Sequence, residues 1–146
     1  MNSYGLGGRM AIALCGVSMI GAAAAYAATP RPGTFTGKVA AGYSAPQIQF
    51  KVKNGQVTSL LARMFYSCNN GPQTQTVIAP SRSYEITSGR FKGKSTESIA
   101  GVASETVWFE GRFTSATKAV GTLRSQTVGS GETCETQERK FTVNKK

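Results

Sequence analysis

The alternation of apolar and polar residues limits the fold of this chain more than any other feature of its sequence. The segment Ile-Gln-Phe-Lys-Val-Lys leads directly into Asn54-Gly55. A period of two is typical of a β-strand with one buried face, and Asn-Gly between two such runs favours a two-residue hairpin, because both turn residues take positive φ. We therefore predict paired strands over about 46–53 and 56–66. A helix over 59–66 is the alternative for part of the second run.

Similar alternation continues to the end of the chain, interrupted by segments that favour turns, such as 69–72 (Asn-Asn-Gly-Pro) and 129–131 (Gly-Ser-Gly). Further strands are expected around Phe35, Gln73–Ala79, Tyr84, Phe91, Val107–Phe113, 117–127 and Glu138–Val143. About eight or nine short strands separated by such turns indicate an all-β fold. We predict a single-domain antiparallel β-sandwich, with a small β-barrel as the alternative.

The N-terminal segment has the pattern of a secretory signal. One positive charge, Arg9, precedes an uncharged stretch over residues 10–25, and residues 25–27 (Ala-Tyr-Ala) form a small-x-small cleavage pattern. A retained membrane anchor is the alternative, but the stretch is shorter than the ~20 residues of a spanning helix. We expect residues 1–27 to be removed as a signal peptide. Residues 28–146 would then form one secreted β domain, extracellular or periplasmic.

The chain has three cysteines, and one of them lies in this uncharged stretch. Cys15 follows Leu14, which is larger than the residue that normally precedes a lipid-modified cysteine, so we do not expect a lipoprotein anchor. Removal of the signal leaves Cys68 and Cys134 in an oxidising compartment, where an even number of cysteines indicates a disulfide. We predict this bridge rather than two unpaired thiols. The long loop that it closes would stabilise the fold by about 4 kcal/mol.

A spaced pattern of strand and turn residues runs through the chain. Its elements are Phe35-x-Gly37, Ile48-x-Phe50-x-Val52, Cys68, Phe109-Glu-Gly111-Arg-Phe113, Ala119-Val-Gly121-Thr122, Cys134 and Phe141-Thr-Val143. In this pattern the chain resembles an uncharacterised group of small secreted bacterial β-sandwich proteins with one disulfide. The resemblance covers nearly all of residues 28–146 and implies the fold and the disulfide. It implies no catalytic or binding residues, because the pattern consists of strand and turn residues.

The composition argues against most kinds of catalytic site. The chain contains no His and no Asp, and its 7 acidic residues are all Glu. Ser-His-Asp and Cys-His arrangements are therefore impossible. Zinc and redox-metal sites lack their usual ligands, a calcium site lacks Asp, and no P-loop or dinucleotide-binding motif occurs. We expect no catalytic residues, no metal site and no cofactor.

Paired glutamates leave one class of enzyme open, the glycoside hydrolases. Glu105 and Glu110 lie on either side of Trp108, and an aromatic ring beside a carboxylate suits a sugar. The two glutamates are five residues apart on one predicted strand, so they would point to opposite faces of the sheet and could not flank one bond. A Glu-dependent carbohydrate-active enzyme is therefore the least favoured hypothesis.

The chain is strongly basic, with a formal net charge of +10, which favours acidic partners. One tryptophan and six basic residues share the predicted outward positions of their strands: Trp108, Arg112, Arg90, Lys92, Lys94, Lys51 and Lys53. If these strands are neighbours in one sheet, its outer face is a cationic surface that carries one indole. Ordinary solvated charge, which also protects edge strands, is the simpler explanation.

These observations favour a secreted, non-catalytic β domain that acts as a binding or interaction module for an anionic polymer or an envelope surface. The expected partner is a nucleic acid, an anionic polysaccharide, a wall polymer or another acidic surface. A structural, envelope-associated protein without a small ligand is the alternative. Salt-sensitive association with a polyanion would favour the first hypothesis.

Overall fold

Ten β-strands, all paired antiparallel, make up the described fold. The computed structural model describes residues 28–69 and 71–146, which contain no helix, so the predicted all-β class is confirmed. The predicted signal, including Cys15, lies outside the described residues. The strands are β1 (Gly33–Val39), β2 (Ile48–Lys53), β3 (Gln56–Cys68), β4 (Thr74–Ile78), β5 (Tyr84–Glu85), β6 (Arg90–Ile99), β7 (Ala103–Ser115), β8 (Lys118–Gly129), β9 (Glu132–Glu135) and β10 (Arg139–Lys145).

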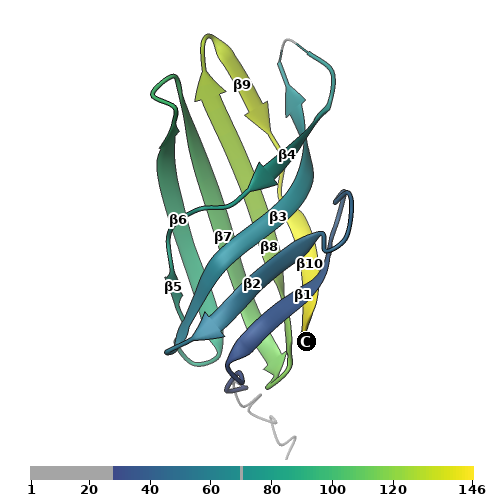
Figure 1. Ribbon diagram of the computed structural model, residues 1–146, viewed down its shortest axis with the longest axis vertical. Helices are drawn as coiled ribbons and strands as arrows, with labels where there is room; N and C mark the ends of the chain where they lie inside the picture. The colour runs from purple at the N-terminus through teal and green to yellow at the C-terminus, as the bar shows by residue number, and fades with distance from the viewer. Residues whose placement is uncertain (1–27, 70) are drawn as a thin grey trace, which may run out of the picture.

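Six strands close into a ring in which each is hydrogen-bonded to the next: β1, β2, β3, β9, β8 and β10. The ring closes because β10 pairs with both β1 and β8, and because the short β9 pairs with both β3 and β8. β7 and β6 continue the sheet beyond β8, while β4 and β5 pair with β3 outside the ring. Of the two predicted architectures, the chain therefore adopts the small β-barrel. Figure 1 shows β1, β2 and β3 crossing in front of the long strands β6, β7 and β8.

No helix that could cross a bilayer occurs in the part of the chain that the structure describes.

The predicted hairpin joins β2 to β3 through Asn54-Gly55. Both residues have positive φ, 52° and 72°, as the sequence pattern requires. The register of the pair then shifts between Gln49 and Lys51, and Ser59, opposite this shift on β3, has a φ of 52°. The irregularity bends β3 without ending it, so the strand runs on to Cys68 and the alternative helix does not form.

Phenylalanine rings fill the lower half of the barrel as drawn in Figure 1. The ring of Phe50, which is fully buried, lies 5.5 Å from that of Phe35, 5.8 Å from those of Phe91 and Phe109, and 6.4 Å from that of Phe141. The five rings come from two groups of neighbouring strands, β10, β1 and β2 in one and β6 and β7 in the other, and the second group lies outside the six-stranded ring. This cluster joins the front of the barrel to the back.

The upper end of the barrel, next to β9, is closed by a disulfide. Cys68 on β3 and Cys134 on β9 are directly opposite each other, with Cα atoms 4.0 Å apart and the predicted bond between their sulfurs. Only one other residue pair joins these two strands, Ser67 with Glu135. The covalent bond therefore reinforces the shortest seam of the ring.

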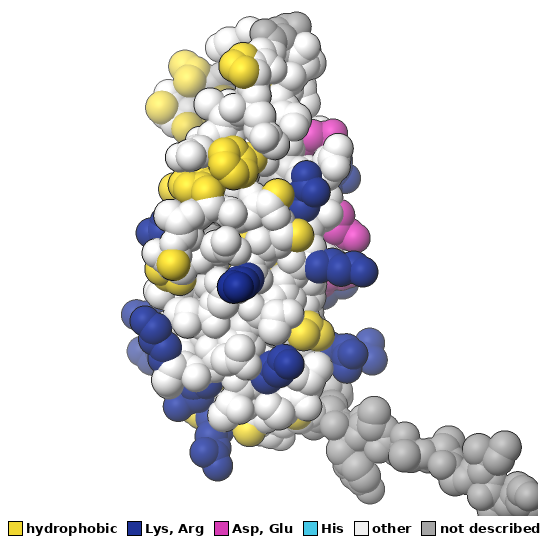
Figure 2. Space-filling view, turned by 90° about the vertical axis from the view of Figure 1, so that its right-hand side faces the viewer, with side chains coloured by type: hydrophobic (Ala, Val, Ile, Leu, Met, Phe, Trp, Pro, Cys, Tyr) yellow, Lys and Arg dark blue, Asp and Glu magenta, His cyan; other side chains and the backbone are white. Residues whose placement is uncertain are grey.

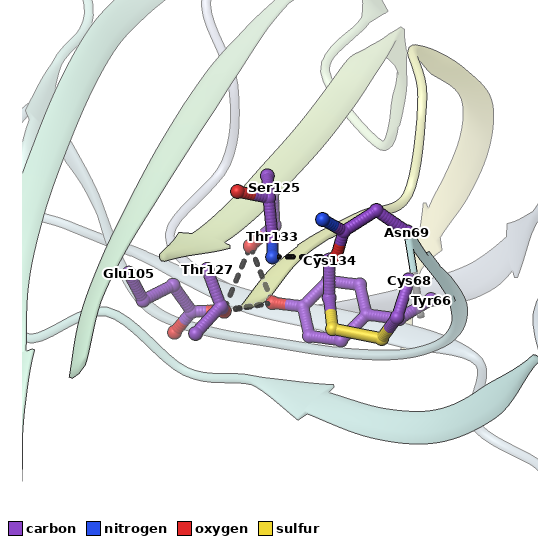
Figure 3. The surroundings of a disulfide bond; sticks show 8 residues. All are labelled: Tyr66, Cys68, Asn69, Glu105, Ser125, Thr127, Thr133 and Cys134. Carbon is purple, nitrogen blue, oxygen red and sulfur yellow. Dashed lines mark hydrogen bonds between the residues drawn. A yellow bond between two sulfur atoms is a disulfide. The ribbon is translucent and has the colours of Figure 1, made fainter. Parts of the chain in front are cut away.

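A network of polar side chains lies inside the barrel beside this disulfide (Figure 3). The Thr127 hydroxyl donates to the Tyr66 oxygen at 3.0 Å, and Tyr66 donates to Glu105 Oε1 at 2.6 Å. The Ser125 hydroxyl donates to the same carboxylate oxygen at 2.7 Å. Burial, together with the hydrogen bond to Glu105, raises the pKa of Tyr66 to about 12. The network ties β3 to β7 and β8 through side-chain hydrogen bonds.

Candidate functional site

The three long strands β6, β7 and β8 position the candidate site on the side of the sheet that faces away from the core. Phe91, Phe109 and Leu123 point inward and are buried. The residues of opposite parity therefore point outward, as expected for extended strands. We call the following set the outer face: Arg90, Lys92 and Lys94 on β6, Trp108, Glu110 and Arg112 on β7, and Val120, Thr122 and Arg124 on β8.

The outer face is organised in rows that cross the three strands. Lys94, Trp108 and Arg124 form the first row, because Trp108 pairs directly with Lys94 on one side and with Arg124 on the other. Lys94 Nζ lies 5.3 Å from the centroid of the indole and Arg124 Cζ lies 4.8 Å from it. Trp108 is half-buried, and the two neighbouring cations cover part of its ring.

The second row contains an ion pair and one further cation. Lys92 pairs with Glu110 on β7, and their charged groups are 2.9 Å apart. The hydrogen bond that Lys92 donates to the Glu110 carboxylate raises the pKa of Lys92. Thr122 completes the row on β8, and Lys140 on β10 pairs with Thr122. Because both partners of the ion pair are exposed, the pair contributes little to stability.

The third row concentrates positive charge. Arg90 and Arg112 are directly opposite each other on β6 and β7. Both side chains are exposed, and within the described residues neither forms an ion pair with a glutamate. Val120 completes the row on β8. Like charges that face each other across two strands destabilise the pairing, so this row is electrostatically unfavourable in the free protein.

The rows border two adjoining hollows on the surface. One, of about 420 Å³, is lined by the second and third rows. The other, of about 360 Å³, lies over the first and second rows and shares Lys92, Glu110 and Thr122 with its neighbour. Glu138 also lines the second hollow, and Glu135 is 3.2 Å from Arg124. Uncompensated positive charge is therefore greatest near Arg90 and Arg112.

On the adjacent side of the molecule, made by β1 and β10, positive charge is also unevenly distributed. Figure 2 shows lysine and arginine side chains over the middle and lower parts of this side, while hydrophobic side chains gather toward its upper part. The segments 64–81, 95–107 and 125–138, which run to and from the upper end, contain no lysine or arginine. The basic residues therefore lie in the middle and lower parts of the molecule.

The structure brings together five of the seven residues predicted for a binding face: Trp108, Arg112, Arg90, Lys92 and Lys94. It separates the other two. Lys51 and Lys53 are exposed on β2, which pairs with β1 and β3 and lies in the front wall of the barrel. Their strand is not a neighbour of β6, so they do not extend the outer face.

Sequence reasoning missed Arg124. The segment around it contains Val120 and Leu123, whose opposite parities gave no clear inward side. The structure shows that Leu123 is buried and Val120 is only half-buried on the outside. If β7 and β8 had been recognised as a hairpin joined by the Ser115–Lys118 turn, the inward direction of Leu123 would have placed Arg124 beside Trp108.

The two glutamates on either side of Trp108 point to opposite faces of the sheet. Glu105 is bonded to Tyr66 inside the barrel, whereas Glu110 pairs with Lys92 outside. They therefore cannot act together on one glycosidic bond. The described residues contain one group with the spacing of metal ligands, Cys68, Glu132 and Cys134, but both sulfurs are already joined in the disulfide.

Comparison with known proteins identifies no relative. No protein-family model matches the chain, and no curated protein and no solved structure matches it significantly.

Proposed function

We propose that this chain is an exported, non-catalytic β domain that binds an anionic polymer or an anionic envelope surface through the outer face. The observation that carries the proposal is the third row, in which Arg90 and Arg112 face each other with no carboxylate between them. Two opposed guanidinium groups weaken the strand pair unless an anion lies between or over them. Arginine is also the residue best suited to bind carboxylate, sulfate or phosphate groups through two parallel hydrogen bonds.

The surrounding geometry supports the same conclusion. The outer face lies on long strands whose inner side is fixed by the phenylalanine cluster, so the backbone positions of its cations are fixed. The hollow beside Arg90 and Arg112 is open and shallow, which suits a chain lying across the surface better than an enclosed small molecule. After loss of Arg9 with the signal, residues 28–146 keep 16 basic and 7 acidic residues, and long-range attraction from this net charge of +9 would speed the encounter with a polyanion.

Export of the protein is part of the proposal. The disulfide is typical of a protein outside the cytoplasm, and the N-terminal sequence has the pattern of a signal. N-terminal sequencing of protein recovered outside the cytoplasm should find Ala28 as the first residue. An intact leader on that protein would contradict this part of the proposal.

Binding to a polyanion can be tested with variants that remove equal charge from two different surfaces. We expect the protein to bind a carboxylated or sulfated polysaccharide at 50 mM salt and to lose most of that affinity at 300 mM, because phosphate-like and carboxylate contacts release counterions. The double variant Arg90→Gln/Arg112→Gln should bind at least about tenfold more weakly. The matched control, Lys51→Gln/Lys53→Gln, loses the same charge from β2 and should bind like the unchanged protein.

Two results would overturn the proposal. One is the absence of salt-sensitive binding to any polyanion at 50 mM salt. The other is an equal loss of binding in the two double variants, since this would show that only the total charge of the molecule matters. Thermal unfolding is the control: Lys51→Gln/Lys53→Gln should leave it unchanged, and Arg90→Gln/Arg112→Gln should not lower the melting temperature, because all four side chains are exposed and the two arginines repel each other.

A further inference from the structure

The free edges of the sheet differ in how they are protected. Among the described residues, only β4, β5 and β6 have a single hydrogen-bonded neighbour. β5 has only two residues, so β4 and β6 form the extended free edges, at the front of the molecule and at its left side in Figure 1. An unpaired edge is a template for another strand unless charge, proline or a covering segment blocks it.

Charge and a covering segment both protect the edge of β6. Lys92 and Lys94 are exposed on this strand. Arg82 donates a hydrogen bond to the backbone oxygen of Lys94 at 2.6 Å. Arg90 exchanges two backbone hydrogen bonds with Thr87. Another strand could pair with β6 only by displacing these contacts and by approaching the two lysines.

The edge of β4 has no such protection. Residues 64–81, which include the whole strand, contain no charged side chain and form the longest uncharged run of residues 28–146. Gln75 and Val77 are exposed, and prolines occur only beyond the two ends of the strand, at positions 72 and 80. β4 is therefore an open edge in a molecule that carries a net charge of +9 over residues 28–146.

The direction of the backbone groups along β4 follows from its pairing with β3. Arg63 on β3 exchanges backbone hydrogen bonds with the segment 43–47, on the side of β3 away from β4. Backbone groups of successive residues point to opposite sides of a strand, so those of Met64 point toward β4, where Met64 pairs with Thr76. The N–H and C=O of Thr76 therefore face β3, and those of its two neighbours in sequence face the free edge.

Gln75 and Val77 thus carry the unpaired groups of the edge. No turn, loop or side chain of the described residues bonds to their backbone. An antiparallel pair with a two-fold axis at Thr76 places Gln75 opposite the partner's Val77, and residues paired in this way exchange both of their N–H···O bonds. The axis repeats this pair, and the prolines at 72 and 80 end the paired segment at equal distances on either side of Thr76. The segment is therefore complementary to itself.

We infer that β4 pairs with β4 of a second copy of the chain about this axis, which joins two β domains into one continuous sheet. Two molecules of net charge +9 repel each other, and like charges that face each other across a strand pair weaken it. The uncharged β4 is the extended edge at which two copies can meet without opposing charges. β4 contributes no residue to the outer face, so this pairing does not depend on polyanion binding.

Sedimentation velocity of the mature protein tests the pairing. Between about 5 μM and about 1 mM protein, we expect the mean mass to rise toward that of a dimer, since a short strand pair makes a small, weak interface. Raising the salt concentration from about 50 mM to about 300 mM should keep or tighten the association, because salt screens the repulsion between two cationic molecules. Polyanion binding responds to salt in the opposite direction, so the two kinds of association can be told apart.

Proline variants test which edge is used. Gln75→Pro removes an N–H that points to the free edge, so it should leave the bonds between β4 and β3 intact but weaken the association about tenfold or more. Ser98→Pro is the matched control on β6. Ser98 lies an even number of residues from Arg90, so its N–H also faces a free edge, and this variant should associate like the unchanged protein.

Cysteine variants test the register. The axis places the two copies of Thr76 directly opposite each other, with Cα atoms about 4.5 Å apart, whereas the two copies of Gln75 are diagonal neighbours about 7–8 Å apart. A disulfide requires Cα atoms within about 7 Å of each other. Thr76→Cys should therefore form a covalent dimer on oxidation, and Gln75→Cys should form little.

Several results would overturn the inference. One is a mass that stays that of the monomer at every protein concentration. Another is an equal loss of association in the two proline variants, which would show that β4 is not the edge involved. If Gln75→Pro fails to fold, the cysteine variants decide, and cross-linking of Gln75→Cys in preference to Thr76→Cys would contradict the two-fold axis at Thr76.

Discussion

The two halves of the barrel interior are stabilised in different ways. In the lower half, four phenylalanine rings pack around that of Phe50 and join strands from the front and the back of the molecule. In the upper half, the corresponding space holds Tyr66, Glu105 and Ser125, which are joined by hydrogen bonds, and the Cys68–Cys134 disulfide. Apolar burial dominates one end, and directional or covalent bonds dominate the other.

This difference follows from the lengths of the seams that close the ring. Five residue pairs join β1 to β10, and six join β10 to β8, so the lower half is bounded by extended strand pairing. Two residue pairs join β3 to β9. A seam this short contributes few backbone hydrogen bonds and little burial. At this end the disulfide and the polar network hold the strands together, as the phenylalanine cluster does at the other end.

The largest expected effect comes from the centre of the lower half. Phe50→Ala should reduce the free energy of unfolding by about 4–5 kcal/mol, because it leaves a cavity that four other rings cannot fill. Urea denaturation at pH 7 measures the loss. Val77→Ala, at a side chain that is 51% exposed, is the control and should change stability by less than about 0.5 kcal/mol. A loss below about 2 kcal/mol for Phe50→Ala would mean that the cluster does not dominate this half.

Removal of the disulfide should cost slightly less and act locally. We expect Cys68→Ala/Cys134→Ala to lower the free energy of unfolding by about 4 kcal/mol, since the bridge closes a loop of 66 residues in sequence separation. Hydrogen exchange should show early loss of protection in β9 and the end of β3, with β1 and β2 still protected. If protection falls equally in both halves, the two ends of the barrel are not separately stabilised and the comparison fails.

The smallest of the three effects concerns the polar network at high pH. The unfolded state loses the Tyr66 proton near pH 10, whereas the folded state keeps it to about pH 12. Between these values the unfolded state binds fewer protons, so stability falls as the pH rises. We expect the native protein to lose about 2–3 kcal/mol more than Tyr66→Phe between pH 9 and pH 12. Denaturation of the two proteins at matched pH provides the measurement, and parallel pH curves would exclude a buried, protonated Tyr66.

Local patterns carried most of the fold. Alternation located the main strands, and Asn54-Gly55 located the hairpin, because these signals depend only on neighbouring residues. The cysteine count gave the disulfide for a similar reason, since one pairing was possible. The choice of a barrel over a sandwich depends on β10 pairing with both β1 and β8, and no local pattern specifies which distant strands become neighbours.

The candidate site shows the same limit. The outward direction of Trp108 and Arg112 followed from the alternation along one strand. The binding-face prediction also required the strand of Arg90, Lys92 and Lys94 to be the neighbour of this strand, and β6 does pair with β7. Lys51 and Lys53 have the same outward pattern but lie in another wall of the barrel, because parity fixes a side chain's direction relative to its own strand only. The contact of Arg124 with the indole was missed since it requires the register between β7 and β8.

The position of β10 has a consequence for how the domain is made. The first and last strands are direct neighbours, with Phe35 opposite Lys145. β1 therefore cannot pair with β10 until the C-terminal end of the domain is available. A chain that crosses a membrane from its N-terminus would therefore emerge as an open, curved sheet and acquire its native form only after translocation is nearly complete. Loss of the final strand alone would expose the edges of both β1 and β8, and exposed edges favour intermolecular strand pairing.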